Sequence, residues 1–208
     1  MNVERLWSFT QFDVWIDTGD FFPNKTRGNR SIEVPYQEGW LRRNYAKSIV
    51  DWLHGRPMIA LQGNHDYVML ADILTSYGAE QAVQLNAHPG TCTIDGIDFG
   101  GFSNIPYIIG EWNHESKGAE LNDACHRTMS RNPQVLLTHA PPHGILDAAG
   151  KDHYGIQQLT GKLLYTPHRI THHLFGHVHE DGGKTKEHEG IKFFNSARKP
   201  QIVNIPYK

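Results

Sequence analysis

The sequence has little of several features that would place it in a special class of protein. Only two of its 208 residues are cysteines, Cys92 and Cys125. A disulfide framework is therefore excluded, and a reducing cytoplasm is the expected location. No apolar run approaches the roughly 20 residues that a helix needs to cross a bilayer, so we expect no membrane association. The first residues also lack the basic start and long apolar stretch of a signal peptide.

Net charge is also low, at −2, which leaves no surplus of basic residues for binding long nucleic acid. Hydrophobic residues make up 38% of the chain and charged residues 20%, as is typical of globular rather than disordered proteins. At this length we expect one core and a single domain over residues 1–208. Histidine, by contrast, is plentiful: the 14 histidines favour metal chemistry.

Four polar motifs each follow a short apolar run. In chain order they are Asp17-Thr18-Gly19-Asp20, Gly63-Asn64-His65-Asp66, Leu137-Thr138-His139-Ala140 and Gly176-His177-Val178-His179. The apolar runs before them predict buried strands over 13–16, 57–61, 134–138 and 170–175. Ligands of α/β proteins gather beyond the carboxyl ends of such strands, so we expect the four motifs to share one edge of the fold.

Helices are expected between these strands. Apolar stripes predict helices over residues 36–54, 67–77, 116–130 and 154–164. The Asp95-Gly96 dipeptide predicts a two-residue hairpin between strands 91–94 and 97–102. We expect loops over 22–35 and 104–115, and two or three antiparallel strands over 183–205. This alternation predicts an α/β protein with two packed sheets covered by helices.

The motifs supply a mixed set of oxygen and nitrogen ligands. Its members are Asp20, Asn64, His139, His177 and His179. Such a set suits Mn, Fe, Zn or a similar divalent transition metal and is poor for calcium. The carboxylate of Asp20 has two oxygens and could bridge two metals. A pair of metals about 3.5–4 Å apart can hold a hydroxide and two phosphoryl oxygens for in-line displacement.

His65 directly follows a candidate ligand, and an imidazole there could donate a proton to a leaving group. Asp66 is expected to orient that imidazole. His143 and His153 are candidates for a supporting role near the site. Taken singly, each motif is an ordinary polar turn, and a lone histidine such as His139 is more often a satisfied core residue. Four such turns in one order are hard to explain by accident.

In this order the motifs resemble the calcineurin-like metallophosphoesterase superfamily, from about Phe12 to Ile205. The segment 136–144, Leu-Leu-Thr-His-Ala-Pro-Pro-His-Gly, is similar to the class III cyclic-nucleotide phosphodiesterase and brain metallophosphoesterase-domain branch. The resemblance implies a four-layer α/β/β/α sandwich with a dinuclear metal centre, and hydrolysis of phosphate esters without a covalent intermediate. It further implies the role of each ligand: Asp20 bridges, Asn64, His139 and His177 complete one metal, and His179 binds the other.

One motif of the family is missing. Its first strand ends in Asp-x-His, whose side chains bind the metal shared with His179, and Asp13 and Asp17 do not occupy that position. Either the chain as given starts downstream of the true start, or the site is reduced, with one metal bound tightly and a second weakly. In the second case four candidate ligands remain for one metal, against two for the other.

Two functions therefore remain open. The first is a metal-dependent phosphoesterase that hydrolyses a small, nucleotide-like phosphodiester or phosphomonoester by attack of a metal-bound hydroxide. The second is a protein of the same fold that has lost catalytic power and serves as a binding scaffold. Retention of His65, Asp66 and both late histidines argues against a pure scaffold. A nuclease acting on long DNA or RNA is disfavoured by the charge balance.

Overall fold

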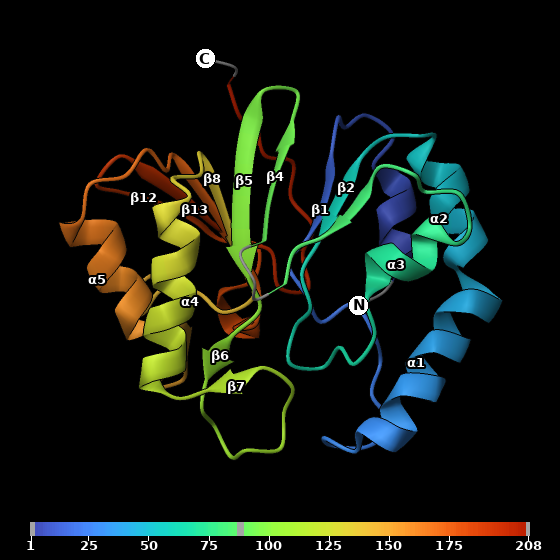
Figure 1. Ribbon diagram of the computed structural model, residues 1–208, viewed down its shortest axis with the longest axis horizontal. Helices are drawn as coiled ribbons and strands as arrows, with labels where there is room; N and C mark the ends of the chain where they lie inside the picture. The colour runs from blue at the N-terminus through green and yellow to red at the C-terminus, as the bar shows by residue number, and fades with distance from the viewer. Residues whose placement is uncertain (1–2, 87–89, 207–208) are drawn as a thin grey trace.

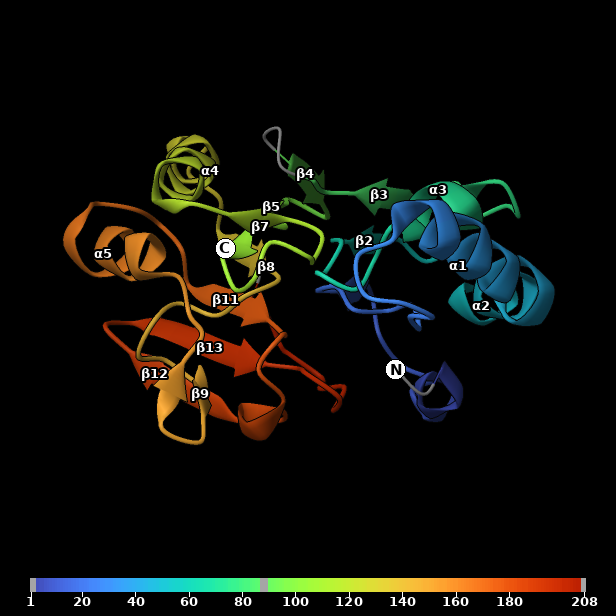
Figure 2. The same cartoon turned by 90° about the horizontal axis from the view of Figure 1, so that it is seen from below.

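In a computed structural model that describes residues 3–86 and 90–206, two β-sheets lie face to face with helices on their outer sides (Figures 1 and 2). The α-helices are α1 (Arg30–Asn44), α2 (Ala46–Leu53), α3 (Leu70–Thr75), α4 (Gly118–Ser130) and α5 (Gln157–Tyr165). Two short 3₁₀ helices are η1 (Val3–Ser8) and η2 (His179–Asp181). None of the helices in the described ranges has the length and apolar character needed to cross a membrane.

The smaller sheet has three parallel strands in the order β1-β2-β3. Their bounds are β1 (Trp15–Asp17), β2 (Met58–Ala60) and β3 (Ala82–Gln84). Trp15, Met58 and Ala60 contribute to a core shared with α1, α2 and α3. These three helices therefore cover the outer face of the smaller sheet.

The larger sheet has six strands in the order β12-β13-β11-β8-β5-β4. Their bounds are β4 (Gly90–Ile94), β5 (Ile97–Phe102), β8 (Val135–Thr138), β11 (His172–Phe175), β12 (Thr185–His188) and β13 (Ile191–Asn195). The four inner strands run parallel, and the edge strands β4 and β12 run antiparallel to their neighbours. Phe102, Leu136 and Phe175 pack with α4 and α5 on the outer face.

The inner faces of the two sheets meet in a third apolar core. Ile59 and Leu61 from the smaller sheet and its flank pack there with Phe99, Leu137 and Leu174 from the larger one. Helices, sheet, sheet and helices thus form four layers, which confirms the expected α/β/β/α architecture. The Asp95-Gly96 hairpin is also confirmed, with φ of +50° and +77° at its two central residues.

One expectation about secondary structure was wrong, and another was confirmed only in part. Helix α1 begins at Arg30, inside the segment expected to be a loop, and a break at Tyr45 separates it from α2. In the C-terminal segment β12 and β13 pair antiparallel, but β13 pairs with β11 in parallel, and residues 199–206 form no strand. Within 104–115 the loop starts and ends in a short parallel pair, β6 (Ile105–Pro106) and β7 (Glu115–Ser116).

A large cavity lies between the sheets along β1. Within the described residues, β1 pairs only with β2, so its other edge is open. The cavity has a volume of about 1240 Å³, and Ile16, Phe99, Leu174 and Val203 line its apolar part. Its polar end is lined by residues of the sequence motifs, Asp20, His65, His177 and His179. The sheet junction therefore brings the motifs to one accessible space.

Candidate metal centre

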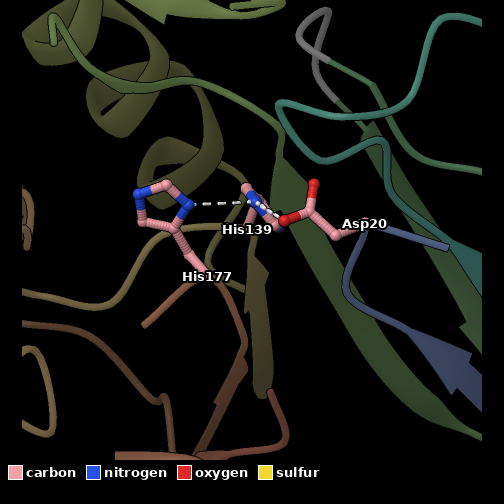
Figure 3. Close-up of side chains that lie close together, drawn as sticks. All are labelled: Asp20, His139 and His177. Atoms are coloured by element: carbon pink, nitrogen blue, oxygen red, sulfur yellow. Dashed lines mark hydrogen bonds and ion pairs between the residues drawn. The ribbon is translucent and has the colours of Figure 1, made fainter. Parts of the chain in front are cut away.

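Four of the five expected ligands converge at the carboxyl ends of β1, β2, β8 and β11. His139 Nε2 lies 3.0 Å from Asn64 Oδ1, 3.4 Å from Asp20 Oδ2 and 3.2 Å from His177 Nδ1. His177 Nδ1 is also 2.9 Å from Asn64 Oδ1. Figure 3 shows His139 between the side chains of Asp20 and His177. Each sheet therefore supplies two of the four groups.

The clustered side chains suit a cation, because lone pairs on their nitrogen and oxygen atoms face one another. His139 Nδ1–H donates to the carbonyl of Thr18 at 2.8 Å, which leaves a lone pair on Nε2. That lone pair points toward oxygens of Asn64 and Asp20, which are themselves acceptors. Ligands held at about 2.0–2.2 Å from one metal lie about 3–3.5 Å apart, as these atoms do. A divalent transition metal would satisfy all of them together.

Ionisation within the cluster supports the same conclusion. Burial alone would raise the pKa of Asp20, but His139 outweighs it and holds this pKa well below its usual range. Burial lowers the pKa of His139, but the negative charge of Asp20 outweighs burial and leaves this pKa raised, so a metal on Nε2 would bind in competition with a proton. Burial and the neighbouring His139 lower the pKa of His177 to about 3, so this imidazole is neutral. The centre thus offers a carboxylate and a neutral imidazole at neutral pH, and attracts positive charge.

The turns that contain Gly19 and Gly63 approach each other so closely that neither position has room for a side chain. A Cβ on Gly63 would collide with the carboxylate of Asp20 and the ring of His139. A Cβ on Gly19 would collide with the backbone of Gly63, and its φ of +98° also favours glycine. Asp20 itself has a φ of +61°, a conformation that non-glycine residues rarely adopt. The backbone is therefore shaped around the ligand cluster.

The carboxylate of Asp66 joins the turn that contains Asp20 to the turn that contains Gly63. This buried carboxylate accepts backbone N–H bonds from Asp20 at 2.7 Å, Gly63 at 2.8 Å and Phe22 at 2.9 Å. Burial, together with the charge of Asp20, raises the pKa of Asp66 to about 6. The structure therefore gives Asp66 a role in positioning the two ligand turns, which differs from the expected role of orienting His65.

His65 lies beside the cluster on the cavity wall. Its backbone N–H donates to Asp20 Oδ1 at 2.9 Å, and its carbonyl accepts from Gln37 Nε2 at 2.6 Å. The partner of its Nδ1 is the side-chain oxygen of Asn24, in the place expected for Asp66. The ring of Trp112 packs against the imidazole, with centroids 4.5 Å apart. These contacts hold the imidazole next to Asp20.

His179 is the expected ligand that does not join the cluster. It is exposed at the start of η2, while the group of mutually close ligand atoms contains Asp20, His139 and His177. His179 still lines the cavity with Asp20, and its pKa is lowered by burial and by Arg198. The left-handed conformation of His177, with a φ of +66°, turns the chain between the two histidines.

Three residues around the centre had no role in the site expected from the sequence. Asp17 is buried at the end of β1 with no partner for its Oδ2, and burial raises its pKa to about 8. Its position one residue after an apolar run was a usable signal for burial. Asn24 and Trp112 come from the loops expected over 22–35 and 104–115, and their contacts with His65 are made only in the folded chain.

Comparisons with known proteins show the family of this chain. The family model for calcineurin-like phosphoesterases matches residues 2–181, a range that spans all four motifs. A UPF0046 protein of Caenorhabditis elegans is 28% identical over 212 residues, which cover 94% of this chain and 69% of that protein.

Two solved structures are also similar, each at 13% identity over 88% of this chain. One is a Staphylococcus aureus protein described as a 5′-nucleotidase (TM-score 0.48), and the other is the sulfate thiohydrolase SoxB of Thermus thermophilus (TM-score 0.42). This chain spans 48% and 33% of their lengths, respectively. Both TM-scores are below 0.5, so the assignment rests on the family model. The chain belongs to the calcineurin-like phosphoesterase family, whose members are metal-dependent hydrolases of phosphate esters.

Proposed function

We propose that this protein hydrolyses a small phosphodiester or phosphomonoester with a nucleotide-like structure. The ligands of the first metal would be Asp20, Asn64, His139 and His177, His179 would serve a second metal, and Mn²⁺ is the first metal to test. A divalent metal held by these groups would supply Lewis acidity toward a phosphoryl oxygen. The observation that carries the proposal is the position of His65, which lies beside the ligand cluster and on the wall of the same cavity.

The side chains at the rim of the cavity favour a small anionic substrate. Lys25 and Arg27 line it from the loop before α1, and both are exposed. The guanidinium of Arg27 lies 5.7 Å from the ring centroid of Trp112, which also lines the cavity. Cationic groups suit a phosphate, and an aromatic face suits the flat base or apolar group of the same molecule.

His65 would act on the leaving group. Its Nδ1 is tied to Asn24, so Nε2 is the nitrogen available for proton exchange with a substrate in the cavity. Its backbone bond to Asp20 keeps that nitrogen near the ligand cluster. A proton delivered to the departing oxygen matters most when that oxygen is a poor leaving group. His65 is therefore expected to discriminate between esters by the basicity of their leaving alcohol.

The test is a His65→Ala variant assayed with Mn²⁺ on phosphate esters of graded leaving-group pKa. Turnover of nucleotide and alkyl esters should fall by roughly 10²-fold, as for a lost general acid, and the loss should shrink for nitrophenyl esters. The exposed His126 on α4 offers a matched control, His126→Ala, which should leave turnover unchanged.

Two results would contradict this assignment at different levels. An equal loss on every ester would make His65 a supporting residue rather than an acid. Failure of the wild-type protein to hydrolyse any phosphate monoester or diester, with Mn²⁺, Fe²⁺ or Zn²⁺ supplied, would overturn the proposed function as a whole.

A further inference from the structure

A second cluster of potential metal ligands lies in the loop between β8 and α5. One ligand atom each from His143, Asp147 and His153 lies within 4.8 Å of the other two. The loop includes a short hairpin of β9 (Ala148–Ala149) and β10 (Asp152–His153). None of these three residues belongs to the first ligand set, and all three come from eleven consecutive positions.

The carboxylate of Asp147 is the fixed point of this cluster. Its side chain is only 1% exposed, and its Oδ2 accepts the backbone N–H of Gly155 at 3.1 Å. Its Oδ1 faces Nδ1 of His153 at 2.7 Å. The carbonyl of Asp147 also accepts the N–H of Tyr154 at 3.0 Å. One carboxylate oxygen is thus anchored, and the other is presented to the histidines.

The position of His143 is set by its backbone. Its N–H donates to the carbonyl of Ile156 at 3.3 Å, and its carbonyl accepts from Thr160 Oγ1 at 2.9 Å. A Cβ on Gly155 would collide with the backbone of His143, so the two ends of the loop are pressed together there. This close approach brings the rings of His143 and His153 to a centroid distance of 5.1 Å.

A simple ion pair explains only part of this arrangement. The contact between Asp147 and His153 would by itself tie the β9–β10 hairpin to the chain before it. It leaves the imidazole of His143 beside them with no hydrogen bond from its ring nitrogens to any part of the described chain. Two imidazoles and one carboxylate gathered at one point form a ligand set that a cation would complete.

We propose that His143, Asp147 and His153 form a second metal site, separate from the first centre, for a divalent transition metal of the zinc class. Two nitrogens and one oxygen suit Zn²⁺ and similar ions, with water in the remaining position. Ligands about 2.1 Å from one tetrahedral ion lie about 3.4 Å apart. The three ligand atoms lie within 4.8 Å of one another, and His153, with its side chain 47% exposed, has room to move closer to His143 when an ion binds.

A metal at this site would stabilise a loop that is bonded to η2, whose first residue lines the large cavity. The N–H of Ala148 donates to Asp181 Oδ2 at 3.1 Å, which joins the hairpin to η2, the helix that begins with His179. The loop itself starts shortly after His139. A metal on the three ligands would therefore fix a segment that follows His139 in the chain and is bonded to η2. This role is structural and does not depend on the proposed function.

The experiment counts Zn²⁺ ions bound by metal-stripped protein in competition with a chromophoric chelator. The variants are His143→Gln and His153→Gln, and the matched control is His126→Gln. Loss of groups that merely support a ligand lowers metal affinity by about 10–100-fold, so loss of a direct ligand should remove one equivalent from the measured range. Circular dichroism would verify that every variant is folded.

The expected result is one fewer Zn²⁺ in each of the two loop variants and no change in His126→Gln. Equal counts and affinities in His143→Gln and wild type would overturn the proposal. So would an equal loss in His126→Gln, which would indicate adventitious binding to exposed histidines. An Asp147→Asn variant, which keeps the shape of the side chain, should reproduce the loss and would confirm that the carboxylate is a ligand.

Discussion

The two sheets hold their halves of the candidate metal centre in different ways. In the larger sheet, His139 directly follows β8, a fully buried strand paired on both sides, and its Nδ1 is locked by a backbone carbonyl. In the smaller sheet, Asp20 follows β1, a three-residue strand with an open edge beside the large cavity. Strand pairing supports His139, whereas the position of Asp20 depends on one buried carboxylate, that of Asp66.

This difference shows where the centre is vulnerable. The pairing of β8 with β5 and β11 is distributed over many backbone bonds, so no single side chain is essential to it. The two turns of the smaller sheet are joined through Asp66, which reaches from one turn to the other. Mutations in the two halves should therefore differ in kind, and the following predictions test that contrast.

The largest effect is expected for Asp66→Ala. It leaves buried N–H groups of Asp20, Phe22 and Gly63 without their acceptor, at about 1–3 kcal/mol each. We expect a loss of roughly 4 kcal/mol in the free energy of unfolding, measured in urea at pH 7.5, where a pKa of about 6 leaves Asp66 ionised. Metal affinity should fall by 10–100-fold or more, because the ligand turns lose their support.

A surface carboxylate provides the comparison. Asp123 on α4 pairs with Arg127 at 2.6 Å in an exposed ion pair. Asp123→Ala should change the free energy of unfolding by about 0.5 kcal/mol or less. If Asp66→Ala is no more destabilising than Asp123→Ala, the smaller sheet does not depend on this carboxylate and the contrast between the sheets fails.

The second prediction concerns the number of metals at the first centre. Four groups surround one position, whereas a second metal would have only the shared carboxylate of Asp20 and the imidazole of His179. In a His143→Gln background, which removes the loop cluster from the count, calorimetry should show one tight equivalent of Mn²⁺ and one weak. Turnover should therefore rise with Mn²⁺ well above the concentration that fills the tight position.

Two variants separate these positions. His139→Ala should weaken the tight equivalent by more than about 10²-fold, since it removes a direct ligand. His179→Ala should leave the tight equivalent unchanged and reduce the activation by excess Mn²⁺. Two tight equivalents in the parent protein would show that another group, with Asp17 as the first candidate, completes the second position.

The sequence alone was sufficient to predict the strands and the hairpin that local residue patterns mark. The apolar runs before the four motifs marked β1, β2, β8 and β11, and the Asp95-Gly96 pair marked its hairpin. The start of α1 could not be found in this way, because the side chains that it buries include Glu33 and Gln37. The carboxylate of Glu33 accepts the N–H of Lys25 at 3.1 Å, and Gln37 binds the carbonyl of His65, so this helix packs by polar contacts that hydrophobic periodicity does not detect.

The same distinction between local signals and long-range contacts applies to the candidate site. The convergence of Asp20, Asn64, His139 and His177 follows from strand ends, which the sequence revealed. The support of Asp66 for the ligand turns and the contact of Asn24 with His65 join segments that are more than 40 residues apart. The parallel pairing of β13 with β11 is likewise a long-range choice that a strand pattern leaves open.

The smallest effect is expected inside the larger sheet, at His173. Its imidazole is fully buried on β11; Nε2 contacts Thr138 Oγ1 at 2.8 Å, and Nδ1 has no partner. Burial lowers its pKa to about 3, against 6.5 in the unfolded chain. Between these values the unfolded chain binds a proton that the native protein does not, so stability falls as pH decreases below about 6.5. The slope from this group should approach about 1.4 kcal/mol per pH unit.

His173→Leu should remove this contribution and leave the protein less sensitive to acid. The hydroxyl of Thr138 remains satisfied in this variant, since it can donate to the carbonyl of Ala140 at 2.6 Å. The measurement is the free energy of unfolding in urea at pH 5 and pH 7.5, with His126→Leu as the exposed control. The difference between the two pH values should shrink in His173→Leu relative to both wild type and the control. An unchanged difference would mean that the histidine is protonated or hydrated in the native sheet, and that the larger sheet is less tightly closed around β11 than its burial indicates.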